Sequence, residues 1–179
     1  MPQQSTATPR EIEQAIRNVP DFPKPGIQFK DITPVLADAR LFSSAIDLLT
    51  ENFKPGSVDA VVGIDARGFI FATAAAVKLS AGFVPVRKKG KLPYQTLEQD
   101  YALEYGSASV AMHVDALKPG ARVLLIDDLL ATGGTSAAAA ALVRKLGANI
   151  LEAAFLIELK FLNGRDRLSG FPVRSLIVY

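Results

Sequence analysis

Two adjacent acids, Asp127 and Asp128, stand between an apolar run and a turn rich in glycine and hydroxyl groups, in the stretch VLLIDDLLATGGTS at residues 123–136. Gly133 and Gly134 allow a tight turn that brings backbone N–H groups close to a ligand. Further hydrogen-bond donors of the turn are Thr132, Thr135 and Ser136. The turn also opens a predicted helix, whose N-terminus attracts anions. Together these features predict a cradle for one phosphate group.

The two carboxylates would repel a phosphate group in direct contact with them, because all of these groups are negatively charged. Asp127 and Asp128 are therefore expected to face sugar hydroxyls, or a Mg²⁺ ion beside them. A phosphate at one end and vicinal hydroxyls at the other describe a ribose 5-phosphate. No Lys-Ser/Thr pair follows the glycines, so the turn is not a Walker loop, and its glycine spacing differs from the dinucleotide fingerprint. The alternative is a plain Gly-Gly turn with capping threonines and solvated acids.

Two further clusters have the residue types of anion sites. In GIDARGF, residues 63–69, backbone N–H groups at a helix start and the Arg67 guanidinium suit a second anion. The alternative there is an ordinary helix cap provided by Asp65. The run RKKGKLP then places four cations within five positions, and these are Arg87, Lys88, Lys89 and Lys91. The alternative for that run is a solvated basic turn.

The elements that must position these clusters alternate along the chain. Apolar runs predict strands at 58–65, 83–87, 101–106, 107–114, 122–126, 150–159 and 173–179, and helical spacing predicts helices at 8–19, 41–53, 68–80 and 135–147. Thr8 and Glu11 form a capping-box pattern, and the proline-rich stretch 20–34 predicts an irregular path. Such alternation predicts a parallel α/β sheet with right-handed crossovers, whose ligands lie beyond the carboxyl ends of the strands.

Composition excludes several classes of function. The chain has 179 residues, no cysteine, one histidine and a formal net charge of +2. These counts exclude thiolate chemistry and a multi-histidine metal cluster, and the charge gives no reason to expect a nucleic-acid or membrane partner. The opening residues lack the apolar segment of a signal peptide, and no apolar run is long enough to span a membrane. We expect a single-domain, soluble, cytoplasmic protein.

Five motifs now carry a family resemblance. The stretch VLLIDDLLATGGTS resembles the phosphoribosyl pyrophosphate motif of the type I phosphoribosyltransferases. DFPKPGIQFKDITPVL, GIDARGFIF, VRKKGKLP and LEYGS, in this order, resemble the adenine-specific members. The resemblance implies one domain over residues 1–179, with a small base-binding hood at about 1–34 and a flexible lid loop at about 93–107. It implies a pentosyltransferase (glycosyltransferase) of purine salvage that converts adenine and phosphoribosyl pyrophosphate to AMP and pyrophosphate with Mg²⁺.

The resemblance also implies roles for the phosphate and sugar residues. The 5-phosphate is expected at Ala131, Thr132, Gly133, Gly134 and Thr135, and the ribose hydroxyls at Asp127 and Asp128. Pyrophosphate is expected at Asp65, Ala66, Arg67, Arg87, Lys88 and Lys91. Arg67 and Lys88 are also assigned to catalysis, and the Asp65–Ala66 peptide bond is expected to be cis. No residue is expected to bind the metal directly, because the substrate would hold Mg²⁺ near Asp127 and Asp128.

For the base, the resemblance implies that Phe29 stacks on adenine, that backbone groups of Gln28 and Lys30 read its edge, and that Leu159 covers its other face. Family members often have arginine at position 30. Glu104 is expected to handle a proton at the purine, and Tyr105 to lie on the lid. The alternatives are plain hydrophobic packing for Phe29 and a solvent-facing carboxylate for Glu104. His113 is expected to be structural.

Partners and competing functions complete the expectations. By analogy with related dimers we expect a homodimer in which Arg87 reaches into the neighbouring site. An oxopurine phosphoribosyltransferase would share the phosphate motif, but it would need a donor, often a lysine, facing the 6-oxo group. A DNA-binding regulator with this fold would need an added reading module, for which the short N-terminal part leaves no room.

Overall fold

The computed structural model describes residues 6–102 and 107–179, which divide near Leu48 into two compact units. Each unit is described by itself. The N-terminal unit contains α1 (Pro9–Ala15), β1 (Arg17–Pro20), β2 (Gln28–Asp31), α2 (Thr33–Ala37) and α3 (Ala39–Leu49), whose last residue falls in the second unit. The capping box of α1 is confirmed: the Thr8 N–H donates to Glu11 Oε2 at 2.8 Å, and the Glu11 N–H donates to Thr8 Oγ1 at 3.3 Å.

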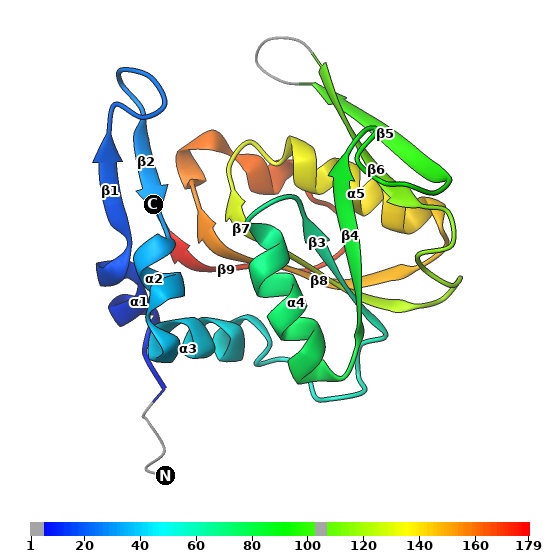
Figure 1. The fold of residues 1–179 in the computed structure, drawn as a ribbon, viewed down its shortest axis with the longest axis horizontal. Helices are drawn as coiled ribbons and strands as arrows, with labels where there is room; N and C mark the ends of the chain where they lie inside the picture. Colours follow the sequence, from blue (N-terminus) through cyan, green and yellow to red (C-terminus); the bar gives the residue numbers. More distant parts are fainter. Residues whose placement is uncertain (1–5, 103–106) are drawn as a thin grey trace. The chain divides into compact units, whose positions relative to one another are not determined.

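The prediction for residues 16–34 was wrong in two respects. Helix α1 ends at Ala15, and the following residues form strand β1, which pairs antiparallel with β2 inside the stretch predicted to be irregular. The register joins Arg17 to Asp31 and Pro20 to Gln28. Because the prolines at 23 and 25 fall in the connecting loop, they leave both strands free to pair. The result is a hairpin that projects from the three helices of this unit (Figure 1).

The second unit is built on a seven-stranded sheet in the order β5-β6-β4-β3-β7-β8-β9. Its strands are β3 (Ala60–Ile64), β4 (Gly82–Lys88), β5 (Thr96–Ala102), β6 (Ser107–His113), β7 (Arg122–Leu130), β8 (Asn149–Glu158) and β9 (Val173–Val178). Its helices are α4 (Gly68–Leu79) and α5 (Gly134–Lys145), with short 3₁₀ turns η1 (Lys160–Leu162) and η2 (Gly164–Arg167). Strands β4, β3, β7, β8 and β9 run parallel, and the β5–β6 hairpin is antiparallel. The mostly parallel sheet confirms the predicted fold class.

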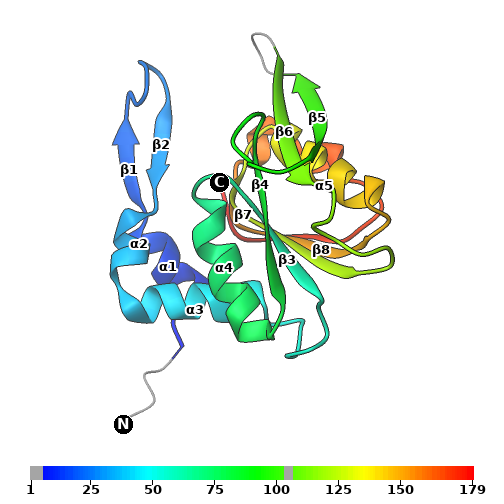
Figure 2. The same cartoon turned by 45° about the vertical axis from the view of Figure 1, so that its right-hand side comes forward.

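The two long helices cover opposite faces of this sheet. β4 follows α4 on one side of β3, whereas β8 follows α5 on the other side of β7. Right-handed crossovers that proceed in opposite directions place their helices on opposite faces, as the two views show (Figures 1 and 2). Phe71 of α4 and Leu142 of α5 are both fully buried. The central strands are therefore covered on both sides, which explains their continuous apolar runs.

Strand β7 is longer than its apolar run predicted. It was expected to end at Ile126, but it continues through Leu130, which pairs with Glu158 of β8 and is fully buried. The ten-residue β8 extends the ladder beyond the acids. Asp127 and Asp128 are therefore held in a strand and not in a loop, which fixes their backbone more firmly than the sequence indicated.

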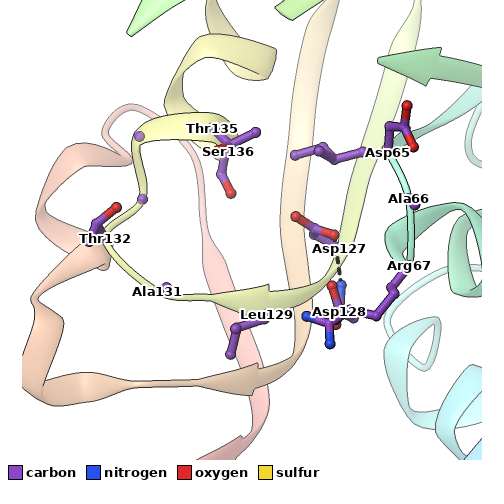
Figure 3. Close-up of a pocket in the computed structure, with 13 residues that line it drawn as sticks. Asp65, Ala66, Arg67, Asp127, Asp128, Leu129, Ala131, Thr132, Thr135 and Ser136 are labelled. Carbon is purple, nitrogen blue, oxygen red and sulfur yellow. Dashed lines mark hydrogen bonds and ion pairs between the residues drawn. The ribbon is translucent and has the colours of Figure 1, made fainter. Parts of the chain in front are cut away.

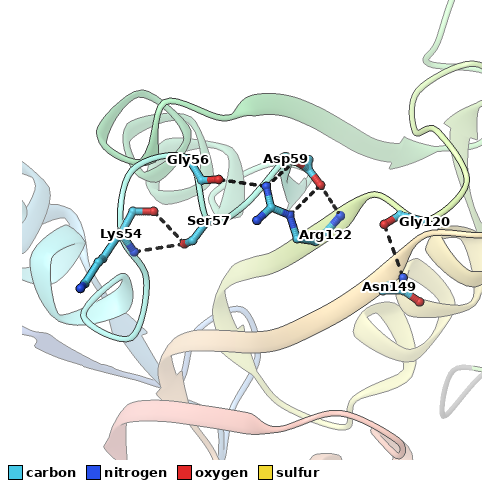
Figure 4. Close-up of polar contacts among 7 residues, drawn as sticks. All are labelled: Lys54, Gly56, Ser57, Asp59, Gly120, Arg122 and Asn149. Carbon is cyan, nitrogen blue, oxygen red and sulfur yellow. Dashed lines mark hydrogen bonds and ion pairs between the residues drawn. The ribbon is translucent and has the colours of Figure 1, made fainter.

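An ion pair joins the amino-terminal ends of two central strands, β3 and β7. Arg122, the first residue of β7, donates to both carboxylate oxygens of Asp59, at 3.0 and 2.7 Å, and to the carbonyl oxygen of Gly56 at 2.9 Å (Figure 4). These hydrogen bonds lower the pKa of Asp59 to about 2. The contact aligns the starts of β3 and β7. No helix among the described residues is long and apolar enough to cross a membrane.

Candidate active site

A cavity of about 300 Å³ lies at the carboxyl ends of β3 and β7 (Figure 3). Its lining residues are Ile64, Asp65, Ala66, Arg67, Asp127, Asp128, Leu129, Ala131, Thr132, Gly133, Gly134, Thr135 and Ser136. The structure thus brings together two of the three clusters singled out in the sequence, the turn after β3 and the stretch after Ile126. Neighbouring parallel strands deliver both clusters to one edge, as a doubly wound sheet requires.

The glycine turn between β7 and α5 has the geometry of an anion cradle. Gly133 precedes the helix with φ +77°, a conformation that L side chains rarely adopt. Gly134 then begins α5, whose first-turn N–H groups have no acceptor within the helix, and Gly134, Thr135 and Ser136 line the cavity together with Thr132. Ser136, which lines the cavity, is almost fully buried. The turn therefore offers several converging donors to one anionic group.

The two acids on β7 are buried beside Arg67. Asp127 is 9% exposed and Asp128 is 6% exposed. Arg67 Nε lies 2.8 Å from Asp128 Oδ2, and the Asp128 N–H donates to Asp127 Oδ1 at 2.9 Å. Burial raises the pKa of Asp127, and the charge of Asp128 raises it further. Burial also raises the pKa of Asp128, although Arg67 opposes this effect.

Gly68 is a site residue that the sequence reasoning missed. It begins α4, is buried and lies directly against Asp127. A Cβ atom at this position would stand 2.4 Å from Asp127 Oδ1 and 3.2 Å from Asp127 Cα. Only glycine allows this approach, so the start of α4 fits tightly against the acid pair. The glycine after the arginine in DARGF was the available signal.

The turn after β3 also carries a link to the basic run. Its Asp65–Ala66 peptide bond is cis, which confirms the prediction. Arg87 Nε donates to Asp65 Oδ2 at 3.0 Å, and Arg87 Nη1 donates to the carbonyl oxygen of Lys91 at 2.9 Å. Lys88 and Lys91 are exposed and do not line the cavity. The run therefore reaches the cavity rim through Arg87.

The residues expected to bind the base lie elsewhere in the chain. Gln28, Phe29 and Lys30 form most of β2 in the N-terminal unit, where Phe29 makes an edge contact with Phe22, with ring centroids 5.1 Å apart, and Lys30 Nζ donates to Asn18 Oδ1 at 2.7 Å. Leu159 follows β8, and its N–H donates to the carbonyl oxygen of Leu130 at 2.9 Å.

Other expected residues complete the survey. Glu104 and Tyr105 lie outside the described residues. Of the expected lid segment 93–107, the structure describes residues 93–102, which include β5, and residue 107. His113 lies in β6, where its ring makes an edge contact with Tyr94. Within residues 6–102 and 107–179, no group of three or more His, Cys, Asp or Glu side chains could hold a metal ion. The acid pair offers hard oxygen atoms to a metal that is held mainly by another ligand.

The comparisons with known proteins agree with this geometry. Residues 28–169 match the family model of the phosphoribosyl transferase domain. Adenine phosphoribosyltransferase of Acidothermus cellulolyticus is 57% identical over 162 residues, which are 90% of this chain and 92% of the relative. The chain belongs to the adenine phosphoribosyltransferase family.

Solved structures of the family share the fold. The crystal structure of adenine phosphoribosyltransferase from Rhodothermus marinus matches with a TM-score of 0.91 and 53% identity, covering 96% of this chain and 98% of that one. The enzyme from Saccharomyces cerevisiae, solved in complex with an imino-altritol bisphosphate and adenine, matches with a TM-score of 0.89 and 42% identity, covering 94% of this chain and 97% of that one.

Proposed function

We propose that this chain transfers the 5-phosphoribosyl group from phosphoribosyl pyrophosphate to adenine, giving AMP and pyrophosphate in purine salvage. One observation carries the proposal: a single cavity joins a glycine-hydroxyl turn at a helix N-terminus to a buried acid pair and an arginine. The identity of the relatives supports adenine as the acceptor, because the Saccharomyces cerevisiae enzyme was solved with adenine bound.

The glycine turn is assigned the 5-phosphate. Its donors are backbone N–H groups of residues 131–135 and the hydroxyls of Thr132 and Thr135, and the α5 N-terminus adds a favourable field. Asp127 and Asp128 are assigned the ribose hydroxyls. Since both carboxylates are buried, hydroxyl donors from a sugar would stabilise their charged forms.

The side of the cavity formed by Asp65, Ala66 and Arg67 is assigned the leaving pyrophosphate, together with Arg87 at the rim and the exposed Lys88 and Lys91. When the bond from C1 to pyrophosphate breaks, positive charge develops on the ribose ring, as in glycoside cleavage. The buried acids lie where they can stabilise that charge, while Arg67 can stabilise the negative charge on the leaving group. Lys88 is assigned a similar electrostatic role.

Magnesium fits this site as a partner of the substrate. The carboxylates of Asp127 and Asp128 offer hard oxygen donors at the cavity, and the described residues offer no complete protein-only coordination shell. The ion would neutralise part of the pyrophosphate charge. The protein residues would then orient the sugar and exclude water.

The base site is assigned to Gln28, Phe29, Lys30 and Leu159. Phe29 would stack on adenine, and the backbone of a regular strand offers alternating N–H and C=O groups to a purine edge. Glu104 is assigned the proton at the purine. The proposal also includes the base-binding hood at about 1–34, a lid with Tyr105 at about 93–107 that excludes water, and a single catalytic domain, 1–179.

A cytoplasmic homodimer, in which Arg87 reaches the neighbouring subunit's site, completes the proposal. Within one chain Arg87 already bonds Asp65 beside the cavity, so it stands at the rim from which such a contact would be made. Sedimentation of the purified protein tests the dimer directly.

The decisive experiment offers phosphoribosyl pyrophosphate and Mg²⁺ with adenine, hypoxanthine, guanine or xanthine in parallel. Formation of AMP alone is expected. An oxopurine nucleotide would keep the phosphate and sugar assignments but overturn the assignment of adenine to the hairpin residues. No nucleotide with any base would overturn the proposed function as a whole.

A further inference from the structure

The chain segments that follow two neighbouring strands lie against each other at the cavity. Leu130 of β7 pairs with Glu158 of β8, and the Leu159 N–H donates to the carbonyl oxygen of Leu130. Beyond this point β7 continues into the glycine turn, and β8 continues into η1 and η2. The turn at residues 131–135 therefore has a second segment of the chain packed directly against it.

The contact between these segments is backbone against backbone. A Cβ atom on Gly164 would stand 2.1 Å from the carbonyl oxygen of Ala131 and 2.8 Å from the backbone nitrogen of Gly133. Conversely, a Cβ atom on Gly133 would stand 2.2 Å from the carbonyl oxygen of Gly164. Gly164 has no positive φ, so close packing and not backbone conformation requires glycine at this position.

The segment packed against the turn, which contains Gly164 and Arg165, is itself held by the buried carboxylate of Glu158. Arg165 donates through Nε to Glu158 Oε1 at 3.1 Å and through Nη2 to Glu158 Oε2, and its Nη1 donates to the carbonyl oxygen of Val173. Ser175 Oγ donates to Glu158 Oε2 at 2.7 Å. Glu158 is 5% exposed, and Arg165 lowers its pKa, so the pair is a two-point, charge-assisted contact.

We propose that residues 163–167, which we call the platform, hold the glycine turn in its phosphate-binding conformation, so that Gly164 and Arg165 are positioning residues for the phosphorylated substrate. This inference rests on the proposed assignment of the 5-phosphate to that turn. Converging N–H groups bind an anion well only when they point to one place, and a displacement of about 1 Å can cost about a hundredfold in activity.

The main test replaces Gly164 with alanine and measures calorimetric binding of ribose 5-phosphate and of pyrophosphate separately. The new methyl group must displace the backbone of Ala131 or Gly133. Binding of ribose 5-phosphate is therefore expected to weaken by about tenfold or more, with pyrophosphate within about twofold. The matched control is Gly82→Ala, whose Cβ would meet only the carbonyl oxygen of Asp59 at 3.6 Å.

Steady-state kinetics separates positioning from a loss of folded protein. Gly164→Ala is expected to raise KM for phosphoribosyl pyrophosphate while KM for adenine stays within about twofold. A purely structural role would instead lower the fraction of active protein and leave both KM values unchanged. Unchanged KM values and unchanged ribose 5-phosphate binding in a folded variant would overturn the inference.

Arg165 supplies a second route if Gly164→Ala does not fold. Arg165→Met removes the hydrogen bonds to Glu158, whereas Arg165→Lys keeps one cation beside it. KM for phosphoribosyl pyrophosphate is expected to be highest in the methionine variant and partly restored in the lysine variant. Equal values in both and in the wild type would overturn the platform alone. Failure of the wild type to bind ribose 5-phosphate would overturn the proposed function with it.

Discussion

At the residue scale, the site places two buried carboxylates beside an arginine. Asp127 and Asp128 are adjacent and almost fully buried, and both have raised pKa values because burial disfavours their charged forms. Arg67 lies at 2.8 Å from one of them. Such an arrangement is costly in the ligand-free protein, and it is typical of a site in which stability is sacrificed for function.

Asp127→Asn tests this trade-off. Since the folded-state pKa of Asp127 lies above its ordinary value of 3.8, ionisation destabilises the folded state as pH rises above that value. The asparagine variant is therefore expected to melt at a higher temperature than the wild type at pH 7, with little difference below pH 3.8. Turnover is expected to fall. Thermal unfolding at several pH values is the measurement, and a lower melting temperature at pH 7 would contradict the argument.

Gly68→Ala tests the fit of α4 against the acid pair. The added methyl group would stand 2.4 Å from Asp127 Oδ1, so the carboxylate or the helix start must move. We expect kcat/KM for phosphoribosyl pyrophosphate to fall by about tenfold to a hundredfold, as for other small displacements at reacting groups. Thr73→Ala, at an exposed position of the same helix, is the control and should retain full activity. Equal kinetics in the two variants would contradict the proposed role of Asp127.

At the scale of secondary-structure elements, apolar patterns predicted the central strands, but they did not predict where β7 ends or that β2 exists. The runs at 122–126 and 150–159 predicted the central strands, because side chains covered on both faces must be apolar. The continuation of β7 to Leu130 depends on pairing with β8, which is far away in the sequence. Strand β2 was missed because the prolines around it indicated a loop, although Pro23 and Pro25 lie in the connection between the paired strands and Pro20 itself pairs with Gln28.

The candidate site was predictable to the extent that its residues are local in sequence. Acids, glycines and hydroxyls lie close together in the sequence between the end of β7 and the start of α5, and they predicted the phosphate cradle. The structure places them around one cavity. Gly164 could not be predicted, because nothing near it in the sequence shows that it meets Ala131 and Gly133. Contacts between the ends of different strands arise only from the folded sheet.

The β1–β2 hairpin supplies a separate test of the base assignment. Phe29→Leu keeps an apolar side chain but removes the flat ring proposed to stack on adenine. KM for adenine is expected to rise by about tenfold, an effect of about 1.4 kcal/mol, while KM for phosphoribosyl pyrophosphate stays unchanged. Phe22→Leu controls for loss of the edge contact between the two rings. If the two variants behave alike, Phe29 acts only through hairpin packing.

At the scale of the second unit as a whole, stabilising contacts lie at the amino-terminal ends of the central strands and functional contacts lie at their carboxyl ends. The Arg122–Asp59 pair joins the starts of β3 and β7, where the hydrogen bonds are complete but largely solvent-exposed, so its net contribution is modest. The carboxyl ends of the same strands carry the cavity and its buried acids. A ligand there would donate hydrogen bonds to the buried acids, and it should therefore stabilise the fold.

Thermal unfolding with and without ligand tests this coupling. At about one hundred times its Kd, phosphoribosyl pyrophosphate with Mg²⁺ should stabilise the folded state by about 2.7 kcal/mol. For a chain of this length that corresponds to a rise in Tm of about 5–10 °C. EDTA should reduce the shift, because the pyrophosphate charge would then meet only protein cations. Gly68→Ala should also reduce it, whereas Thr73→Ala should not. A full shift in EDTA would contradict the role given to Mg²⁺, and a full shift in Gly68→Ala would place the ligand outside this cavity.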